Sequence, residues 1–358
     1  MQLRNSTRSM GGRAGMTVIA SLLAASLAVA GERDRGVLVL ASTNDPSANQ
    51  VLVYQLQTGD SPALSLVQTL ATGGRGGAGN NAGILQMKDD FGAVANYGSN
   101  SVSELVRAAD FVEVTRQIRL APGCVKPDSV ALTRDQLFVV GANCLESHAW
   151  PSGLADGAVV HLADASAAQI AVGRTWGAVT FTSGAVDQVG LTSGGTLTGS
   201  VSPVALPSDA NNTPLGAAFW GNILGFTPAH SPDSFVIVDG QRHAYPIAGP
   251  TPPYPTNAPC WVAKGPGNVW YTGNSPGHAI SIFFSDGKGG AFYKSVPLPG
   301  VPTDITVSQD RKWLAVIYSA NGSGYVAVFA VDQYGDLTPE ATSNPIGVPA
   351  FNGVAISE

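Results

Sequence analysis

Short apolar runs alternate with turns rich in glycine and proline along most of the chain. One phrase recurs: a proline, one variable residue, a short apolar run, a turn and a second apolar run. It is clearest at 126–141, 258–272 and 301–318. Apolar runs of this length bounded by turn residues predict β-strands, and two of them around a short turn predict a hairpin. We therefore expect the chain to be built from repeated β-hairpins.

The hairpins recur at a regular spacing when the residue two positions after the proline is used as a marker. Four copies have the proline and three keep the pattern without it, and the seven markers are Gly83, Ser129, Gly177, Gly216, Trp261, Asp304 and Gly353. Successive markers are 46, 48, 39, 45, 43 and 49 residues apart. A period of about 45 residues, with up to four short strands each, is typical of a β-propeller blade. We predict an all-β, seven-bladed propeller of four-stranded blades, because accidental similarity within a β-sandwich would not produce seven phased copies.

The two ends of the chain predict how the ring closes. The last copy, at 353–358, stops after one strand, whereas the first strand after the N-terminal segment, at 36–41, has no inner strand before it. Pairing these two strands would complete one blade from both ends of the chain and remove sheet edges that would otherwise aggregate. Residues 31–358 are then expected to form a single propeller domain.

The N-terminal 30 residues have the layout of a secretory signal peptide. Arg4, Arg8 and Arg13 precede an apolar run at 16–29, and Ala28-Val29-Ala30 is a small-x-small cleavage motif. A membrane anchor is the alternative, but about 14 apolar residues fall short of the roughly 20 that span a bilayer. The expected location is therefore secreted or periplasmic, without membrane insertion.

Composition and charge narrow the class further. The chain is 44% hydrophobic and only 12% charged, with 43 glycines and 24 prolines, which argues against both disorder and a helical bundle. Beyond residue 30 it holds 16 basic and 25 acidic residues, a net charge of −9, and has no basic patch. Nucleic-acid binding is therefore not expected. No metal-ligand spacing of the Cys-x-x-Cys type is present, so we expect neither a metal nor another cofactor. We also expect the protein to be a monomer.

The three cysteines divide into a pair and a single residue. Cys124 lies just before the inner strand of its blade and Cys144 just after the second strand, symmetric about the predicted turn at 133–135. Facing positions across an antiparallel pair suit a disulfide, and export permits one. Cys260, beside Trp261, is expected to be a small apolar residue at a strand start rather than a nucleophile.

Reactive side chains fall in loops that we expect around one mouth of the central channel. These loops enter a first strand or leave a second one, and loops of this kind often carry function. The candidate acid–base residues are His148, His230 and Glu146, and the candidate substrate-binding residues are Arg75, Arg174, His278 and Trp150. Such a set would suit general acid–base chemistry on a lactone or a carboxylated substrate. The alternative for each histidine is a solvated loop residue.

Parts of the repeat also resemble a known family. The run at 91–105, which includes Val94-Ala95-Asn96 and Ser101-Val102-Ser103, is similar to a phrase of the lactonase-like seven-bladed propellers, as is the run at 316–331. That family includes propeller-type 6-phosphogluconolactonases and carboxy-muconate cyclases. The resemblance covers about 36–358 and implies the propeller fold. Cytoplasmic members have a Gly-Pro-Arg-His phrase before an inner strand, which this chain lacks, so no catalytic residue is transferred.

Two functional hypotheses follow. The first is an exported lactone hydrolase or cyclase (a cycloisomerase) that acts on a small lactone or unsaturated carboxylate. The second is a non-catalytic propeller that recognises a protein, glycan or polymer through its rim. Convergence of the rim residues would favour the enzyme, whereas a plugged channel mouth with His148 far from the arginines would favour the binding protein.

Overall fold

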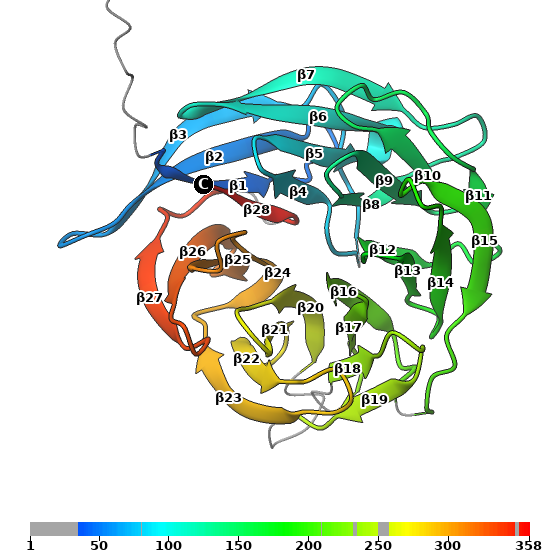
Figure 1. Ribbon diagram of the computed structural model, residues 1–358. Helices are drawn as coiled ribbons and strands as arrows, with labels where there is room; N and C mark the ends of the chain where they lie inside the picture. The colour runs from blue at the N-terminus through cyan, green and yellow to red at the C-terminus, as the bar shows by residue number, and fades with distance from the viewer. Residues whose placement is uncertain (1–34, 80, 209, 232–234, 250–257, 348–350) are drawn as a thin grey trace, which may run out of the picture. The chain divides into compact units, whose positions relative to one another are not determined.

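A computed structural model describes residues 35–358 except 80, 209, 232–234, 250–257 and 348–350. The expected signal peptide therefore lies outside the described residues. The described part contains seven four-stranded antiparallel sheets, which Figure 1 shows as the blades of one ring. The predicted seven-bladed propeller is confirmed.

Each blade begins with an inner strand at the centre of the ring, and its other strands follow outward. Blade 1 consists of β28 (Val354–Ser357), β1 (Val37–Ser42), β2 (Gln50–Gln57) and β3 (Ala63–Ala71). Blade 2 consists of β4 (Leu85–Lys88), β5 (Phe91–Asn96), β6 (Ser101–Ala108) and β7 (Phe111–Arg119), with a short 3-10 helix, η1 (Tyr97–Ser99), between β5 and β6. Blade 3 consists of β8 (Pro127–Leu132), β9 (Gln136–Gly141), β10 (Cys144–Ala149) and β11 (Val160–His161).

The remaining four blades have the same order. Blade 4 consists of β12 (Ala167–Val172), β13 (Trp176–Phe181), β14 (Val186–Leu191) and β15 (Leu197–Pro203). Blade 5 consists of β16 (Pro214–Trp220), β17 (Ile223–Pro228), β18 (Phe235–Val238) and β19 (Ala244–Ile247). Blade 6 consists of β20 (Pro259–Lys264), β21 (Val269–Asn274), β22 (Ala279–Phe284) and β23 (Ala291–Pro297). Blade 7 consists of β24 (Val301–Val307), β25 (Trp313–Ala320), β26 (Ser323–Val331) and β27 (Leu337–Thr342).

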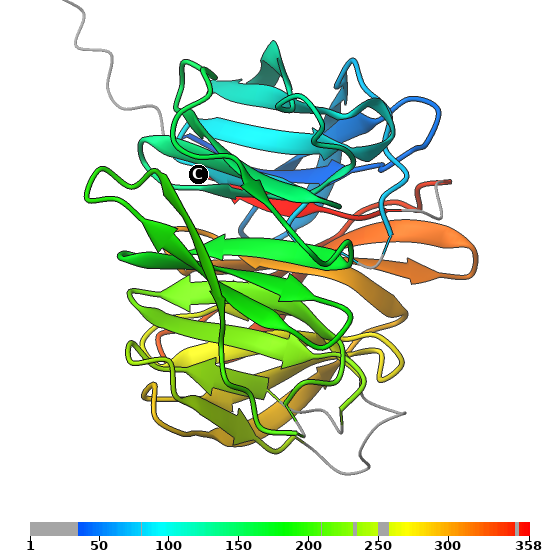
Figure 2. The same ribbon diagram turned by 90° about the vertical axis from the view of Figure 1, so that its right-hand side faces the viewer.

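The ring closes as the two ends of the chain predict. The C-terminal strand β28 pairs antiparallel with β1, with Leu38 opposite Ser357 and Ala41 opposite Val354. Each inner strand runs from one face of the ring to the other, so the chain alternates between the two faces that are seen edge-on in Figure 2. We call the face where inner strands begin the entry face, and the face where they end, at the turn into the second strand, the exit face.

One marker in the repeat was placed wrongly by the sequence pattern. Gly177 lies in β13, the second strand of blade 4, and Gln169 in β12 occupies the position of the other markers. The pairing register slips at Gln169 as it does at Ser129, Trp261 and Asp304. With Gln169, the two spacings around this blade become 40 and 47 residues. The inner strand of blade 4 lacks the proline and has a polar residue in its middle, which is why the repeat pattern misses it.

The markers are structural residues that join neighbouring inner strands. Ser129 Oγ accepts the N–H of Ile170 (3.4 Å), and Gln169 Oε1 accepts the N–H of Ala217 (2.6 Å). In the same way Asp304 Oδ2 accepts the N–H of Val354 (3.2 Å), which belongs to the closing strand β28. Each acceptor is a marker, and each donor follows the marker position of the next blade along the chain. These bonds use backbone donors that would otherwise be unpaired at the centre of the ring.

The apolar core consists of layers between adjacent blades. Phe138 of blade 3 and Phe181 of blade 4 belong to one buried cluster. Phe235 of blade 5 packs against Trp270 of blade 6, with ring centroids 5.3 Å apart. Each fully buried large apolar side chain stabilises the fold by about 1.5–3 kcal/mol. The blades therefore form a rigid scaffold in which the inner strands are held around a central channel.

Candidate functional site

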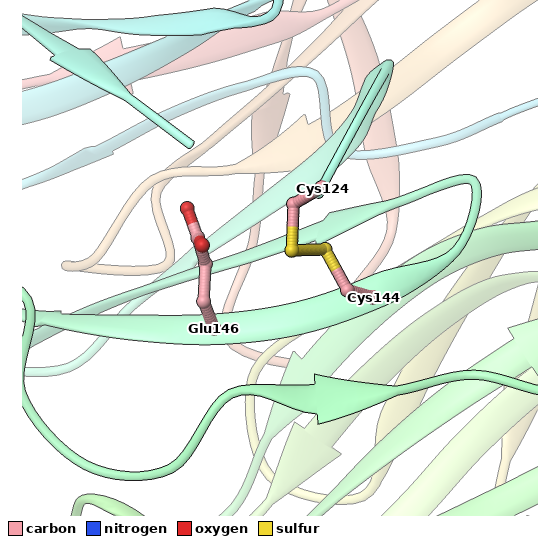
Figure 3. Close-up of side chains that lie close together, drawn as sticks. All are labelled: Cys124, Cys144 and Glu146. Atoms are coloured by element: carbon pink, nitrogen blue, oxygen red, sulfur yellow. A yellow bond between two sulfur atoms is a disulfide. The ribbon is translucent and has the colours of Figure 1, made fainter. Parts of the chain in front are cut away.

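The predicted disulfide is present between Cys124 and Cys144, whose Cα atoms are 5.6 Å apart (Figure 3). It links the connection before β8 to the first residue of β10, and both cysteines are buried. Figure 3 also shows the carboxylate of Glu146 beside the two sulfur atoms. The three groups lie within 4.8 Å of one another, which is close enough for a metal site. Because the sulfurs are bonded to each other, they are not thiolate ligands, and the cluster does not fit a metal ion.

Glu146 and His148 form a buried pair within β10. His148 Nε2 lies 3.1 Å from Glu146 Oε1, and His148 Nδ1 lies 3.2 Å from the carbonyl oxygen of Gly153. Glu146 Oε2 also accepts the N–H of Ala121 at 2.7 Å. Both ring nitrogens of His148 thus face hydrogen-bond acceptors. The pair connects β10 to the segments on either side of it, and His148 is only 3% exposed.

The expectation that Glu146 and His148 lie in a loop at the channel mouth is therefore wrong. The third strand, β10, occupies 144–149, and its residues 145–149 pair with β9. Trp150 is also buried, and its ring packs edge-on against Phe91 at 6.1 Å. Its backbone N–H donates to the carbonyl oxygen of Asp135, in the first hairpin of blade 3, which places Trp150 near the exit face.

Arg174 was also expected at the wrong face. It lies in the turn from β12 to β13, at the exit face, and its backbone N–H donates to the carbonyl oxygen of Gly221 in the corresponding turn of blade 5. The error follows from the misplaced marker Gly177, because an inner strand taken at 177 makes Arg174 precede it. The turn therefore leaves a first strand instead of entering one.

Three other predicted residues lie in connections on the entry face. Arg75 follows β3 and donates through Nη2 to the carbonyl oxygen of Gly98 at 2.9 Å. His230 follows β17, and its Nδ1 lies 2.8 Å from Thr213 Oγ1. His278 lies in the turn between β21 and β22. The seven predicted catalytic and substrate-binding residues are thus divided between the entry face, the interior of β10 and the exit face.

A short segment before β4 crosses the channel at the entry face. The N–H of Ala82 donates to the carbonyl oxygen of Ala168 in blade 4 (3.3 Å), and the side chain belongs to a buried cluster with Trp261 and Ile305 of blades 6 and 7. Next to it, Asn81 Oδ1 accepts a hydrogen bond from Asn352 Nδ2 at 2.7 Å. Ala82 is only 2% exposed. Residues 81–83 therefore close the channel mouth at which a rim site was expected.

Behind this closure lies a cavity of about 250 Å³ in the centre of the ring, lined by all seven inner strands. Its wall is largely made of small and apolar residues, including Ala131, Ala171, Ala218, Ala263 and Ala355. Its polar and charged lining residues include Gln169 and Asp304 near the entry face and Lys264 and Arg311 near the exit face. The sequence pattern identified Asp304 only as a repeat marker, and it did not identify Gln169, Lys264 or Arg311 as site residues.

Asp304 is a buried carboxyl group in this cavity. Oδ1 accepts the N–H of Ile305 at 2.8 Å, and Oδ2 accepts the N–H of Val354 at 3.2 Å. Burial raises its pKa from 3.8 to about 7, although the two backbone hydrogen bonds oppose the shift. Within the described residues, no lysine, arginine or histidine forms an ion pair with it. A buried carboxylate without a cation is costly, so this group gains from a proton or from a cationic partner.

Lys264 and Arg311 have different environments at the other end of the cavity. Lys264 Nζ donates to the carbonyl oxygens of Gly265, Gly267 and Val269 at 2.8, 2.7 and 3.0 Å. Burial, together with the charge of Arg311, lowers the pKa of Lys264 to about 7. Arg311 donates through Nη1 to the carbonyl oxygen of Lys264 and is half-buried. The donors of Lys264 are thus occupied by its own hairpin. The Arg311 side chain forms one hydrogen bond within the described residues, with Glu358 as a charged neighbour, and a guanidinium has five N–H donors, so donors remain for a ligand.

The residues that resemble the lactonase-like phrase brace a hairpin and do not line the cavity. Asn96 Nδ2 donates to Ser103 Oγ at 2.8 Å, and Asn96 Oδ1 accepts from Thr72 Oγ1 at the same distance. The same arrangement recurs in blade 6, where Asn274 Nδ2 donates to Ser281 Oγ at 2.7 Å. The resemblance therefore rests on residues that stabilise the turn between the second and third strands.

No model of a known protein family and no curated protein matches the chain. Solved structures do match in fold. A protein from Lactobacillus plantarum is 13% identical with a TM-score of 0.66, over 90% of this chain and 99% of the other. A protein proposed to be a 6-phosphogluconolactonase from Bacteroides fragilis is 12% identical with a TM-score of 0.64, over 92% and 99% of the two chains.

A more distant match is a catalytically inactive virginiamycin B lyase from Staphylococcus aureus with quinupristin. It is 12% identical with a TM-score of 0.54, over 79% of this chain and 92% of the other. Identities this low establish the fold alone. The chain is a seven-bladed β-propeller similar in fold to lactonase-like propellers, and no helix in its described residues is long and apolar enough to cross a membrane.

Proposed function

We propose that this protein binds a small molecule with a carboxylate group in its central cavity. The molecule enters the cavity from the exit face. The observation that carries the proposal is the cavity itself, which residues 81–83 close at the entry face and Arg311 borders near the exit face. The seven predicted rim residues are spread over the molecule, because three lie on the entry face, Arg174 lies on the exit face and the other three are buried.

The lining favours a small ligand with an anionic group. Pockets for drug-sized molecules have volumes of about 300–1,000 Å³, whereas this cavity has about 250 Å³. The alanine-rich wall suits a short carbon skeleton, and the planar guanidinium of Arg311 suits a carboxylate, which it binds through paired N–H donors. Half-burial of Arg311 strengthens such an interaction, because the local dielectric constant is lower than in water.

Opening or closing of a lactone in the same cavity is the second candidate function. Asp304 lines the cavity, and its pKa of about 7 suits a general base or acid near neutral pH. The likeness in fold to a protein proposed to be a 6-phosphogluconolactonase is consistent with this chemistry. We also infer export, because the N-terminal 30 residues have the layout of a signal peptide and the disulfide suits an oxidising compartment.

Calorimetric titration of the purified protein with small mono- and dicarboxylates tests the binding function. We expect Arg311→Gln to weaken binding at least about tenfold, which corresponds to about 1.4 kcal/mol for a lost charged hydrogen bond. Arg75→Gln, on the entry face, is the matched control and should leave binding unchanged. If the Arg75 variant loses binding and the Arg311 variant binds as the wild type does, the site lies on the entry face and the proposal is wrong.

A pH-stat assay with the corresponding lactones separates the two candidates. Turnover that is lost in Asp304→Asn while carboxylate binding persists would establish the enzyme. Binding without turnover of any lactone would leave the protein as a binding propeller.

A further inference from the structure

The central cavity has an acidic side chain near one end and a basic side chain near the other. Asp304 and Gln169 lie at the closed end and Arg311 at the open end. We infer that the ligand is a short zwitterion, an amino carboxylate whose ammonium group points inward to Asp304 and whose carboxylate points outward to Arg311. This inference rests on the proposed function and specifies the class of ligand.

The closed end offers acceptors. The Asp304 carboxylate has about four lone-pair sites, and backbone N–H groups use two of them. Gln169 Oε1 accepts one backbone N–H and has a second lone pair. An ammonium group has three donors and no acceptor, so it matches the acceptors that remain. It would also supply the cation that the described residues do not provide to Asp304.

The same end disfavours a second carboxylate. A dicarboxylate long enough to contact Arg311 would bring its other carboxylate close to Asp304, which is buried and has no cationic partner among the described residues. Two negative groups this close repel each other strongly unless one of them takes up a proton. A dicarboxylate would therefore bind more weakly than an amino carboxylate of the same length.

The spacing of the two ends sets the length of the ligand. Trp261 is the marker of blade 6 at the level of Asp304, and the carbonyl oxygen that binds Arg311 belongs to Lys264, three residues further along β20. At about 3.3 Å per residue, the two ends are about 10 Å apart. Charge-assisted hydrogen bonds of about 2.8 Å at each end leave about 4–5 Å between the ammonium nitrogen and the carboxylate. β-Alanine and γ-aminobutyrate have about this length.

The experiment is calorimetric titration of the purified protein with two matched series of ligands. The amino carboxylates are glycine, β-alanine, γ-aminobutyrate and δ-aminovalerate, and the dicarboxylates are malonate, succinate, glutarate and adipate. At pH 8 we expect the best amino carboxylate to bind at least tenfold more tightly than the best dicarboxylate. Asp304→Asn should reduce this preference to less than about threefold, and Arg311→Gln should weaken both series. These expectations follow from the value of charged hydrogen bonds.

Asp128→Asn is the matched control, because Asp128 is also a buried carboxyl whose pKa is raised to about 7, but it does not line the cavity. It should leave the preference unchanged. If Asp304→Asn does not fold, the wild-type comparison still decides. If dicarboxylates bind as tightly as amino carboxylates and Arg311→Gln weakens their binding, the inference of a zwitterionic ligand is wrong and the proposed function stands. Failure of every ligand in both series to bind overturns the proposed function as well.

Discussion

Replacement of Asp304 by asparagine should change how the stability of the protein depends on pH. Burial raises the pKa of this carboxyl from 3.8 to about 7, so the folded protein binds its proton more tightly than the unfolded chain does. The stabilisation that this proton provides is complete below about pH 4 and is lost as the pH rises toward and through 7. The shift of about 3 pH units corresponds to about 4 kcal/mol in total, at about 1.4 kcal/mol per unit.

Between pH 5 and pH 8 the wild type should lose about 2.5 kcal/mol of this contribution relative to Asp304→Asn, which does not titrate. The free energy of unfolding of both proteins, measured by urea titration at the two pH values, tests this. Asp60→Asn, which replaces an exposed carboxyl between β2 and β3, is the control and should follow the wild type. If the difference between Asp304→Asn and the wild type is the same at pH 5 and pH 8, the carboxyl does not titrate in a buried environment and its raised pKa is refuted.

Three further substitutions test structural roles. His148→Ala should lower the free energy of unfolding by about 3 kcal/mol, because it leaves a cavity and removes the side chain that contacts Glu146 and the Gly153 carbonyl, and a smaller loss than about 1 kcal/mol in urea titration would show that these contacts are not needed. Cys124→Ser removes a crosslink between positions separated by 20 in sequence and should cost about 3 kcal/mol, so an unchanged melting temperature would contradict it. Gly216→Ala would place a Cβ 2.7 Å from a Cα of blade 6, whereas Gly79→Ala would meet nothing within 4 Å. We expect a loss of about 1–3 kcal/mol in the first and little change in the second, and equal stabilities would refute the close approach of the two inner strands.

The blade count could be predicted from the sequence because it depends on local patterns, and the ring closure could be inferred from the incomplete blade at each end of the chain. Each blade is a meander of short strands and tight turns, so its signal lies within about 45 residues and repeats. The disulfide was predictable for the same reason, since Cys124 and Cys144 flank one hairpin. The one misplaced repeat marker was that of blade 4, because β12 has no leading proline and has the polar Gln169 in its middle. This error led to the prediction of Arg174 on the wrong face.

The site was much less predictable. Loop position suggested that His148 and Arg75 would share a rim, but β10 buries His148 with Glu146, while Arg75 bonds to a neighbouring turn on the entry face. Asp304 and Arg311 lie close in the sequence, but nothing in the pattern indicates that they line one cavity with Gln169. Gln169 lies more than a hundred residues before Asp304, and the two side chains line one cavity only because their strands pack around the same axis.

The sequence by itself thus determined the kind of strand, the turns and the number of blades, because these follow from residue periodicity over short distances. Only the tertiary structure decided which mouth of the channel is closed and which charged groups face the cavity. The closed channel mouth depends on the hydrogen bond from Ala82, which precedes blade 2, to blade 4. The cavity depends on the packing of seven inner strands around one axis. Such contacts form between segments far apart in the chain, so no local pattern of apolar and polar residues records them.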